Sequence, residues 1–252
     1  MKKIKSKNRK NNKLNKRAIV ICLICATLVA IGVIVAVICL GGSDNVDSET
    51  TAAGTEYKSE AIDKSFESIS LGSGIRLISL AEVSANYPED GSDVYTENVL
   101  SATFVNESTE MLQYAVIEVN ISGEKFTFDI SSIPAGEKVI ALENNKRSAP
   151  EKIENISCRA SNIVFFESAP SKMSDKLSIT FQNGMVTIHN VSEEDLTGNI
   201  SIYYKNKMDD AYFGGITYRI NISDLDAGEK IKGASSHADS DDSVLMFVQY
   251  VP

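Results

Sequence analysis

Two blocks of sequence occur twice along this chain, in the same order. Residues 106–112 and 190–196 both read N-x-S-x-E-x-L, and residues 126–138 share six identities in 13 positions with residues 218–230. Two blocks repeated in the same order indicate a structural unit that has been copied once. The offset between the copies grows from 84 residues at the first block to 92 at the second. The second copy therefore holds eight extra residues, which we place in a hairpin around residues 205–215.

Apolar and polar residues alternate around these blocks, as expected for half-buried strands. The pair Asn183-Gly184 predicts a two-residue hairpin turn, and we expect Gly136 and Gly228 to adopt positive φ. The residues predicted to face a core are Leu100, Ala102, Phe104, Ala115, Ile117, Val119, Ile121, Phe126, Phe128 and Ile130, and in the second copy Val186, Ile188, Ile200, Ile202, Tyr204, Tyr218, Ile220 and Ile222.

The predicted fold is mainly β, with six or seven short strands in each copy. Such strand numbers suit a two-sheet β-sandwich. We expect one sandwich module at residues 70–168 and a second at residues 177–252, joined by a linker at residues 169–176.

An uncharged apolar run of 23 residues precedes the repeat, at residues 18–40. As a helix it would be about 34 Å long, against a hydrocarbon thickness of about 30 Å. Residues 1–17 carry nine Lys and Arg, which favours a cytoplasmic N-terminus and places the C-terminal modules outside the plasma membrane. We favour this single-pass anchor over a cleaved signal peptide, whose apolar run is shorter, about 7 to 15 residues.

The charge of the chain is divided between its two ends. Residues 41–252 hold 16 basic and 34 acidic side chains, a net charge of −18 that disfavours nucleic acid as a partner. Residues 41–69 begin as a small, polar and acidic segment, so we expect a flexible stalk. Residues 57–68 are a candidate for a short helix within it.

The repeated unit resembles a known class of module. The unit consists of a strand after N-x-S-x-E-x-L, a hairpin, and a strand ending in Ala-Gly-Glu-Lys. This arrangement is similar to that of the immunoglobulin-like modules, including the FxLYD type, of surface proteins from low-GC Gram-positive bacteria. At the FxLYD position this chain has Ile200-Ser201-Ile202-Tyr203-Tyr204, which lacks the Phe and the Asp. The resemblance implies an anchored exterior protein without catalysis, often of unknown ligand.

Residues that could carry catalysis are few. The exterior part has two histidines, His189 and His237, and lacks the nucleophile-elbow, phosphate-loop, dinucleotide and H-E-x-x-H patterns. We expect no enzyme and no cofactor. The one metal candidate is a Ca²⁺ site at Asp239, Asp241 and Asp242, where three carboxylates fall within four residues; a solvated turn is the alternative.

The inserted hairpin is the predicted interaction surface. It offers Tyr203, Lys205, Tyr212 and Phe213, and aromatic residues at a loop tip give large contact area at low entropic cost. The alternative is that Tyr204 and Phe213 cap the core of the module.

These observations predict a membrane-anchored extracellular recognition protein whose partners are the lipid bilayer and an unknown protein or surface ligand. The alternative is an accessory or structural subunit of a cell-envelope complex, in which the span itself makes the functional contacts. Ala26, Ala30, Gly32 and Ala36 would give that helix a packing surface. The oligomeric state does not follow from the sequence.

Overall fold

The computed structural model describes residues 57–63, 66–239 and 241–252. The basic segment at 1–17, the span at 18–40 and the stalk up to residue 56 lie outside the described residues. Within the described part the fold is mainly β, as predicted, and is built from 14 strands. No helix in that part is long and apolar enough to cross a membrane.

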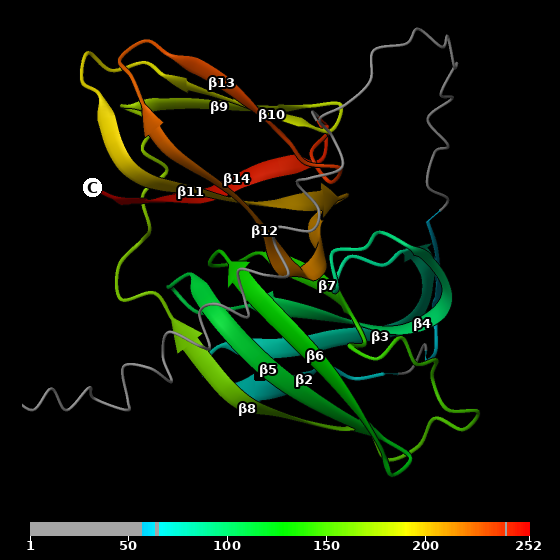
Figure 1. Ribbon diagram of the computed structural model, residues 1–252. Helices are drawn as coiled ribbons and strands as arrows, with labels where there is room; N and C mark the ends of the chain where they lie inside the picture. Colours follow the sequence, from blue (N-terminus) through cyan, green and yellow to red (C-terminus); the bar gives the residue numbers. More distant parts are fainter. Residues whose placement is uncertain (1–56, 64–65, 240) are drawn as a thin grey trace, which may run out of the picture. The chain divides into compact units, whose positions relative to one another are not determined.

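The strands divide into a first half, β1–β8, and a second half, β9–β14 (Figure 1). The first half contains β1 (Lys58–Ala61), β2 (Ile69–Gly72), β3 (Ile75–Asn86), β4 (Tyr95–Asn106), β5 (Leu112–Ile121), β6 (Glu124–Ile133), β7 (Lys138–Leu142) and β8 (Ser157–Phe165). The second half contains β9 (Leu177–Gln182), β10 (Met185–Asn190), β11 (Leu196–Met208), β12 (Ala211–Leu225), β13 (Lys230–Ala234) and β14 (Ser243–Val251).

Three sheets hold these strands. The largest has the order β1-β3-β4-β7-β12-β11-β14, with β2 also paired to β3, and the two smaller sheets have the orders β6-β5-β8 and β13-β10-β9. Each small sheet shares a core with the part of the large sheet from its own half. In the first half, Phe104 and Phe128 meet edge to face inside that core, with ring centroids 6.0 Å apart.

Most residues predicted to face a core are buried. The rows on β4, β5 and β6 of the first half are at most 1 % exposed, and Ile200, Ile202 and Tyr204 on β11 are 0 % exposed. On β12, Tyr218, Ile220 and Ile222 are only partly buried against the second core. The Asn183-Gly184 turn is confirmed, since both residues have positive φ, 47° and 72°, between β9 and β10.

The repeated N-x-S-x-E-x-L blocks form the same hydrogen-bonded turn in both halves, which we name the anchor turn. In the first half the buried Asn106 amide donates to the carbonyls of Glu110 (2.8 Å) and Ile133 (2.9 Å) and accepts from the Ser108 hydroxyl (2.6 Å). In the second half Asn190 does the same with Glu194, Leu225 and Ser192, at 2.8, 3.1 and 2.7 Å. The repeat therefore encodes one local structure twice.

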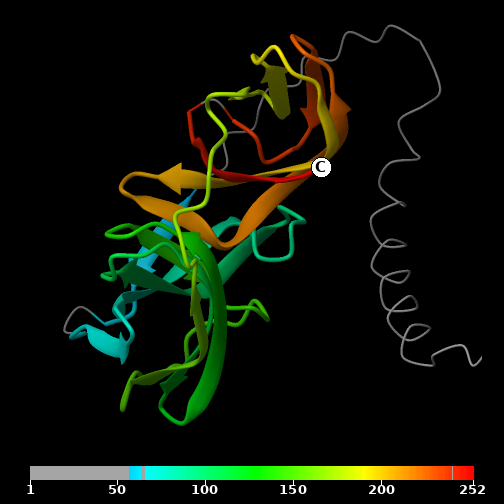
Figure 2. The ribbon, with the colours of Figure 1, turned by 90° about the vertical axis from the view of Figure 1, so that its left-hand side faces the viewer.

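The two halves are joined within the large sheet. Ala211, Tyr212 and Phe213 at the start of β12 pair in parallel with Lys138, Val139 and Ile140 of β7. Figure 1 shows β12 reaching from the second half to β7, and Figure 2 shows the gold and orange β11–β12 hairpin lying against the green strands of the first half. The inserted residues lengthen this hairpin, so the insertion makes the joint.

The candidate helix at residues 57–68 is not formed by the described residues of that segment. Lys58–Ala61 is strand β1, which pairs antiparallel with β3 from Lys58 opposite Ser84 to Ala61 opposite Ala81. Four residues gain ladder hydrogen bonds from an existing strand edge, whereas a helix this short would not offset the cost of its first turn. Part of the predicted stalk therefore belongs to the sheet.

Candidate functional site

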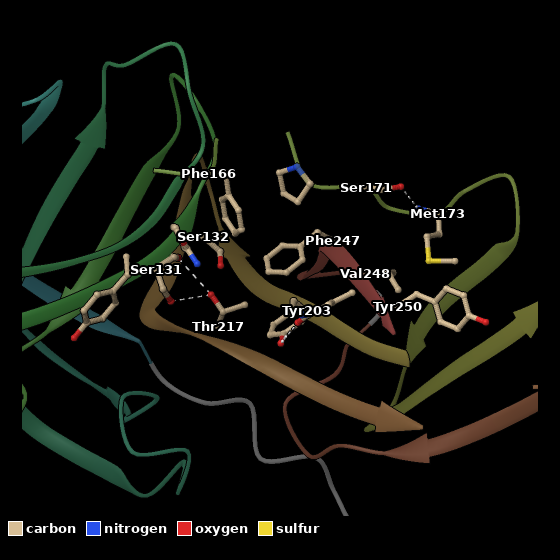
Figure 3. Close-up of a pocket in the computed structure, with 14 residues that line it drawn as sticks. Ser131, Ser132, Phe166, Ser171, Met173, Tyr203, Thr217, Phe247, Val248 and Tyr250 are labelled. Atoms are coloured by element: carbon tan, nitrogen blue, oxygen red, sulfur yellow. Dashed lines mark hydrogen bonds between the residues drawn. The ribbon is translucent and has the colours of Figure 1, made fainter. Parts of the chain in front are cut away.

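A groove lies where the two halves meet, and we name it the junction groove. Its volume is about 810 Å³, and residues of β5, β6, β11, β12, β14 and the segment after β8 line it. That volume falls within the usual range of ligand sites, about 300 to 1,000 Å³. Figure 3 shows its lining residues converging from these separate elements.

Three aromatic side chains form one wall of the groove. Tyr203 on β11 stacks on Phe247 on β14, with centroids 4.3 Å apart and planes inclined by 18°. Phe166, which follows β8, meets Phe247 edge on at 5.3 Å. Tyr203 and Phe247 face each other on paired strands of the second half, and Phe166, from the end of the first half, completes the wall.

Hydroxyl and amide groups form a second, polar wall of the groove. The Ser131 hydroxyl on β6 lies 2.9 Å from the Thr217 hydroxyl on β12 and donates to the Gly215 carbonyl at 3.1 Å, so the polar wall also crosses between the halves. Tyr203 donates its phenolic hydrogen to Gln249 Oε1 at 3.2 Å. Figure 3 shows Ser131, Ser132 and Thr217 side by side on this wall.

The groove carries no formal charge on its lining. The lining residues, all from the described part of the chain, include no Asp, Glu, Lys, Arg or His. Residues 41–252 as a whole have a net charge of −18, so the groove is a neutral area of a strongly acidic polypeptide.

Two charged residues, the half-buried Glu89 and the buried Lys205, hold the hairpin in place. The Glu89 carboxylate, in the loop after β3, accepts hydrogen bonds from the backbone N–H groups of Leu142 (2.8 Å), Gly215 (2.8 and 2.9 Å) and Ile216 (3.2 Å). The Lys205 ammonium is 0 % exposed and donates to the carbonyls of Gly214, Gly215 and Ile216 at 2.9, 3.0 and 2.5 Å. The hairpin is thus tied both to the first half and across itself.

Burial dominates the titration of both groups. It lowers the pKa of the Lys205 ammonium to about 7, against which the Glu89 charge acts. Burial also raises the pKa of the Glu89 carboxyl, while the backbone N–H groups of Gly215 and Leu142 oppose the rise. A charge removed from water is tolerated only with such partners, and here backbone N–H groups serve Glu89 while backbone carbonyls serve Lys205.

Gly215 permits the close approach of β12 to β6. A Cβ atom at this position would lie 1.8 Å from the Asp129 carbonyl oxygen, far inside van der Waals contact. The glycine therefore sets the spacing between the halves beneath the polar wall.

The structure places the four predicted interaction residues at the joint between the halves. Lys205 is 0 % and Tyr212 4 % exposed, so these two do not form an exposed recognition loop. Phe213 is partly buried against Tyr87, Val99 and Leu142 of the first half. The physical reason is that the hairpin tip pairs with β7, and only Tyr203 of the four lines the junction groove.

The candidate calcium ligands Asp239, Asp241 and Asp242 lie in the turn before β14. The Asp239 N–H donates to the Ser243 hydroxyl at 2.9 Å, and the Asp241 N–H donates to Asp239 Oδ1 at 3.1 Å. Burial, and then the charges of Asp239 and Asp241, raise the pKa of Asp242. Among the described residues, which omit Ser240, no group of three or more His, Cys, Asp or Glu side chains is arranged to hold a metal ion.

His237 and Cys158 take part in packing. His237 Nδ1 contacts the Asp93 carboxylate, and its ring stacks on Tyr218 at 4.2 Å. His189 lies on β10 opposite Lys230 and Ser178. Cys158 is a free thiol, half-buried, and burial raises its pKa to about 12.

Of the residues that line the groove, only Tyr203 was predicted from the sequence to contact a ligand. A usable signal was present in β14, where Val244-Leu245-Met246-Phe247-Val248 is continuously apolar. Such a run indicates a strand buried on both faces. Met246 and Phe247 pack into the first core, while Leu245 and Val248 pack into the second.

Neither the protein-family models nor the curated proteins compared with this chain match its sequence.

Proposed function

We propose that this chain is a non-catalytic recognition protein, anchored in the plasma membrane by residues 18–40, which presents two tandem immunoglobulin-like β-sandwich modules outside the cell. The observation that carries the proposal is the junction groove, because both halves contribute to its aromatic and polar walls. Concave sites with apolar walls and a few placed polar groups are the usual form of ligand sites. The groove is therefore where we place the protein or surface ligand.

The architecture supports the proposed display of two β-sandwich modules. Each half pairs a small sheet with part of the large sheet around its own core, as an immunoglobulin-like sandwich does. The parallel pairing of β7 with β12 and the charged residues Glu89 and Lys205 fix the halves to each other. A fixed joint keeps the groove walls in register, which lowers the cost of ordering them when a ligand binds.

The chemistry of the groove supports binding over catalysis. General acid–base catalysis requires a titratable group in reach of the reacting atoms, most often His, Asp, Glu or Lys. The groove lining is made of aromatic, aliphatic, hydroxyl and amide side chains instead.

Site-specific photocrosslinking in cells that produce the full chain tests this function. A benzophenone amino acid at Gln249, exposed at the groove, is expected to form an adduct of raised mass. The matched control is the same amino acid at Lys232, an exposed position on β13 that does not line the groove. Adducts that form equally at both positions would contradict groove recognition.

The same experiment distinguishes groove recognition from the alternative function, that of an accessory subunit. A benzophenone amino acid at Gly32, within the predicted span, reports contacts of the helix. Adducts at Gly32 without any at Gln249 would favour an accessory subunit of an envelope complex, whose contacts lie in the membrane.

A further inference from the structure

We infer that the junction groove binds a neutral oligosaccharide, that is, a short glycan without carboxylate, sulfate, phosphate or amino charges. The inference rests on the proposed function and names the ligand class of the same groove. Three properties of the groove carry it: an aromatic wall, a polar wall of side-chain hydroxyls and amides, and the absence of formal charge on its lining.

The aromatic wall suits the apolar face of a sugar ring. A pyranose presents C–H groups on its faces and hydroxyls around its edge, and C–H groups are attracted to the electron-rich faces of aromatic rings. Tyr203 and Phe247 stack nearly parallel, inclined by 18° with centroids 4.3 Å apart, so each ring covers one face of the other and only the outer faces of the stack can receive a sugar. The stack is held from two paired strands, and Phe166 stands edge on to Phe247 beside it.

The polar wall suits the rim of hydroxyls. Serine, threonine and glutamine side chains both donate and accept hydrogen bonds, as sugar hydroxyls require. Ser132 is 4 % exposed and lines the groove, and none of the hydrogen bonds found among the described residues uses its hydroxyl. Gln113 and Gln249 are exposed at the groove and place amide groups there.

The electrostatics favour an uncharged ligand. A charged ligand entering the groove would lose hydration without gaining an ionic partner from the lining. Anionic polymers would also be repelled by the net charge of −18 on residues 41–252.

A glycan fits better than an extended peptide. Extended peptides commonly bind by adding a strand to a free sheet edge. Two edge strands line the groove, β14 and β6. The Val248 N–H of β14 already donates to the Ser171 carbonyl at 2.8 Å, and the Ser131 carbonyl of β6 accepts from the Thr217 hydroxyl at 3.4 Å. Part of each edge that a peptide would need is therefore already in use.

The test is a microarray followed by titration calorimetry with the full chain. The chain is purified in an amine-oxide detergent, because maltoside detergents carry neutral sugars that would compete. The probes are neutral tetrasaccharides built from glucose, N-acetylglucosamine, mannose and galactose, together with tetragalacturonate as an acidic counterpart. We expect binding of at least one neutral probe and none of tetragalacturonate.

Variants locate the binding. Tyr203→Ala removes one ring of the stack and is expected to weaken binding at least about tenfold. Tyr203→Phe keeps the ring and should bind within about threefold of the parent chain. Tyr95→Ala, at a tyrosine on β4 that does not line the groove, is the control and should bind as the parent does.

A second variant keeps the test valid if Tyr203→Ala does not fold. Gln249→Glu alters an exposed side chain and introduces a charge into the groove, so the chain should fold and bind less tightly. The inference is overturned if no neutral probe binds at millimolar concentration, or if both Tyr203→Ala and Gln249→Glu bind as the parent chain does.

The nature of the Gln249 photoadduct separates the two proposals. A glycan adduct supports both the function and the ligand class. A peptide adduct without neutral-glycan binding would leave groove recognition standing and overturn the glycan inference. Without an adduct or any glycan binding, both fail.

Discussion

The two copies of the repeat agree at their anchor turns and differ at their hairpins. Both turns bury an asparagine whose amide donates to two backbone carbonyls. The hairpins differ in length, since β5 and β6 have 10 residues each, whereas β11 and β12 have 13 and 15. The shared element builds each half, and the element that differs joins the halves.

This comparison shows how a duplicated unit can acquire a new role without losing its fold. The extra residues extend two strands rather than forming a loop, so their backbone groups pair with β7 and within the hairpin. Lys205, Tyr212 and Phe213 lie in this extension, and all three are at least partly buried. A difference in length between repeats is therefore a signal for an interface.

The largest effect is expected at the hairpin of the second copy. Lys205→Met removes the donor to three carbonyls and a positive charge that acts on Glu89, so we expect a loss of about 4 kcal/mol in the free energy of unfolding. Urea denaturation of the full chain measures it. Lys125→Met in the first hairpin is the control, where the exposed ammonium pairs with Glu118 at the surface and its loss should be small. Equal losses in both variants would contradict the role of the joint.

The anchor turns should respond alike in both halves. Asn106→Ala and Asn190→Ala each leave buried carbonyls without a donor, and each should lower the free energy of unfolding by about 2 kcal/mol. Asn162→Ala on β8, where the side chain is exposed, should change little. Thermal unfolding of the three variants gives the comparison, and a large effect in only one half would show that the repeated turns are not equivalent.

The smallest effect is the pH dependence of the joint. Because the pKa of Lys205 falls from 10.5 to about 7 on folding, the unfolded chain binds more protons than the folded chain between these values. Stability from this group therefore rises with pH above 7, by on the order of 1 kcal/mol up to pH 8.5. The measurement is the stability of the parent chain minus that of Lys205→Met at several pH values. A difference that falls over this range would contradict the assignment.

Local features were predictable from the sequence because their causes lie within a few residues. The Asn183-Gly184 turn and the inward rows on β4 to β6 follow from turn chemistry and a two-residue period. The joint was not predictable in this way. Lys205 in an insertion indicates a solvated side chain, and Glu89, which holds Gly215 of the same hairpin, lies in a loop of the other half.

The groove escaped prediction for a related reason. Phe166, Tyr203 and Phe247 are far apart in the sequence, and each taken alone fits an ordinary packing role. Only the docking of the two halves brings them to one wall.

The buried asparagines carry a consequence for producing the chain. Asn106-Glu107-Ser108 and Asn190-Val191-Ser192 both match the acceptor triplet of N-linked glycosylation. A eukaryotic secretory host that attached sugar to either amide before folding would replace a hydrogen that the anchor turn donates, and would force a bulky group into a closed space. Comparing the yield of folded chain from a bacterial host with that from a eukaryotic secretory host would reveal how strongly that modification competes with folding.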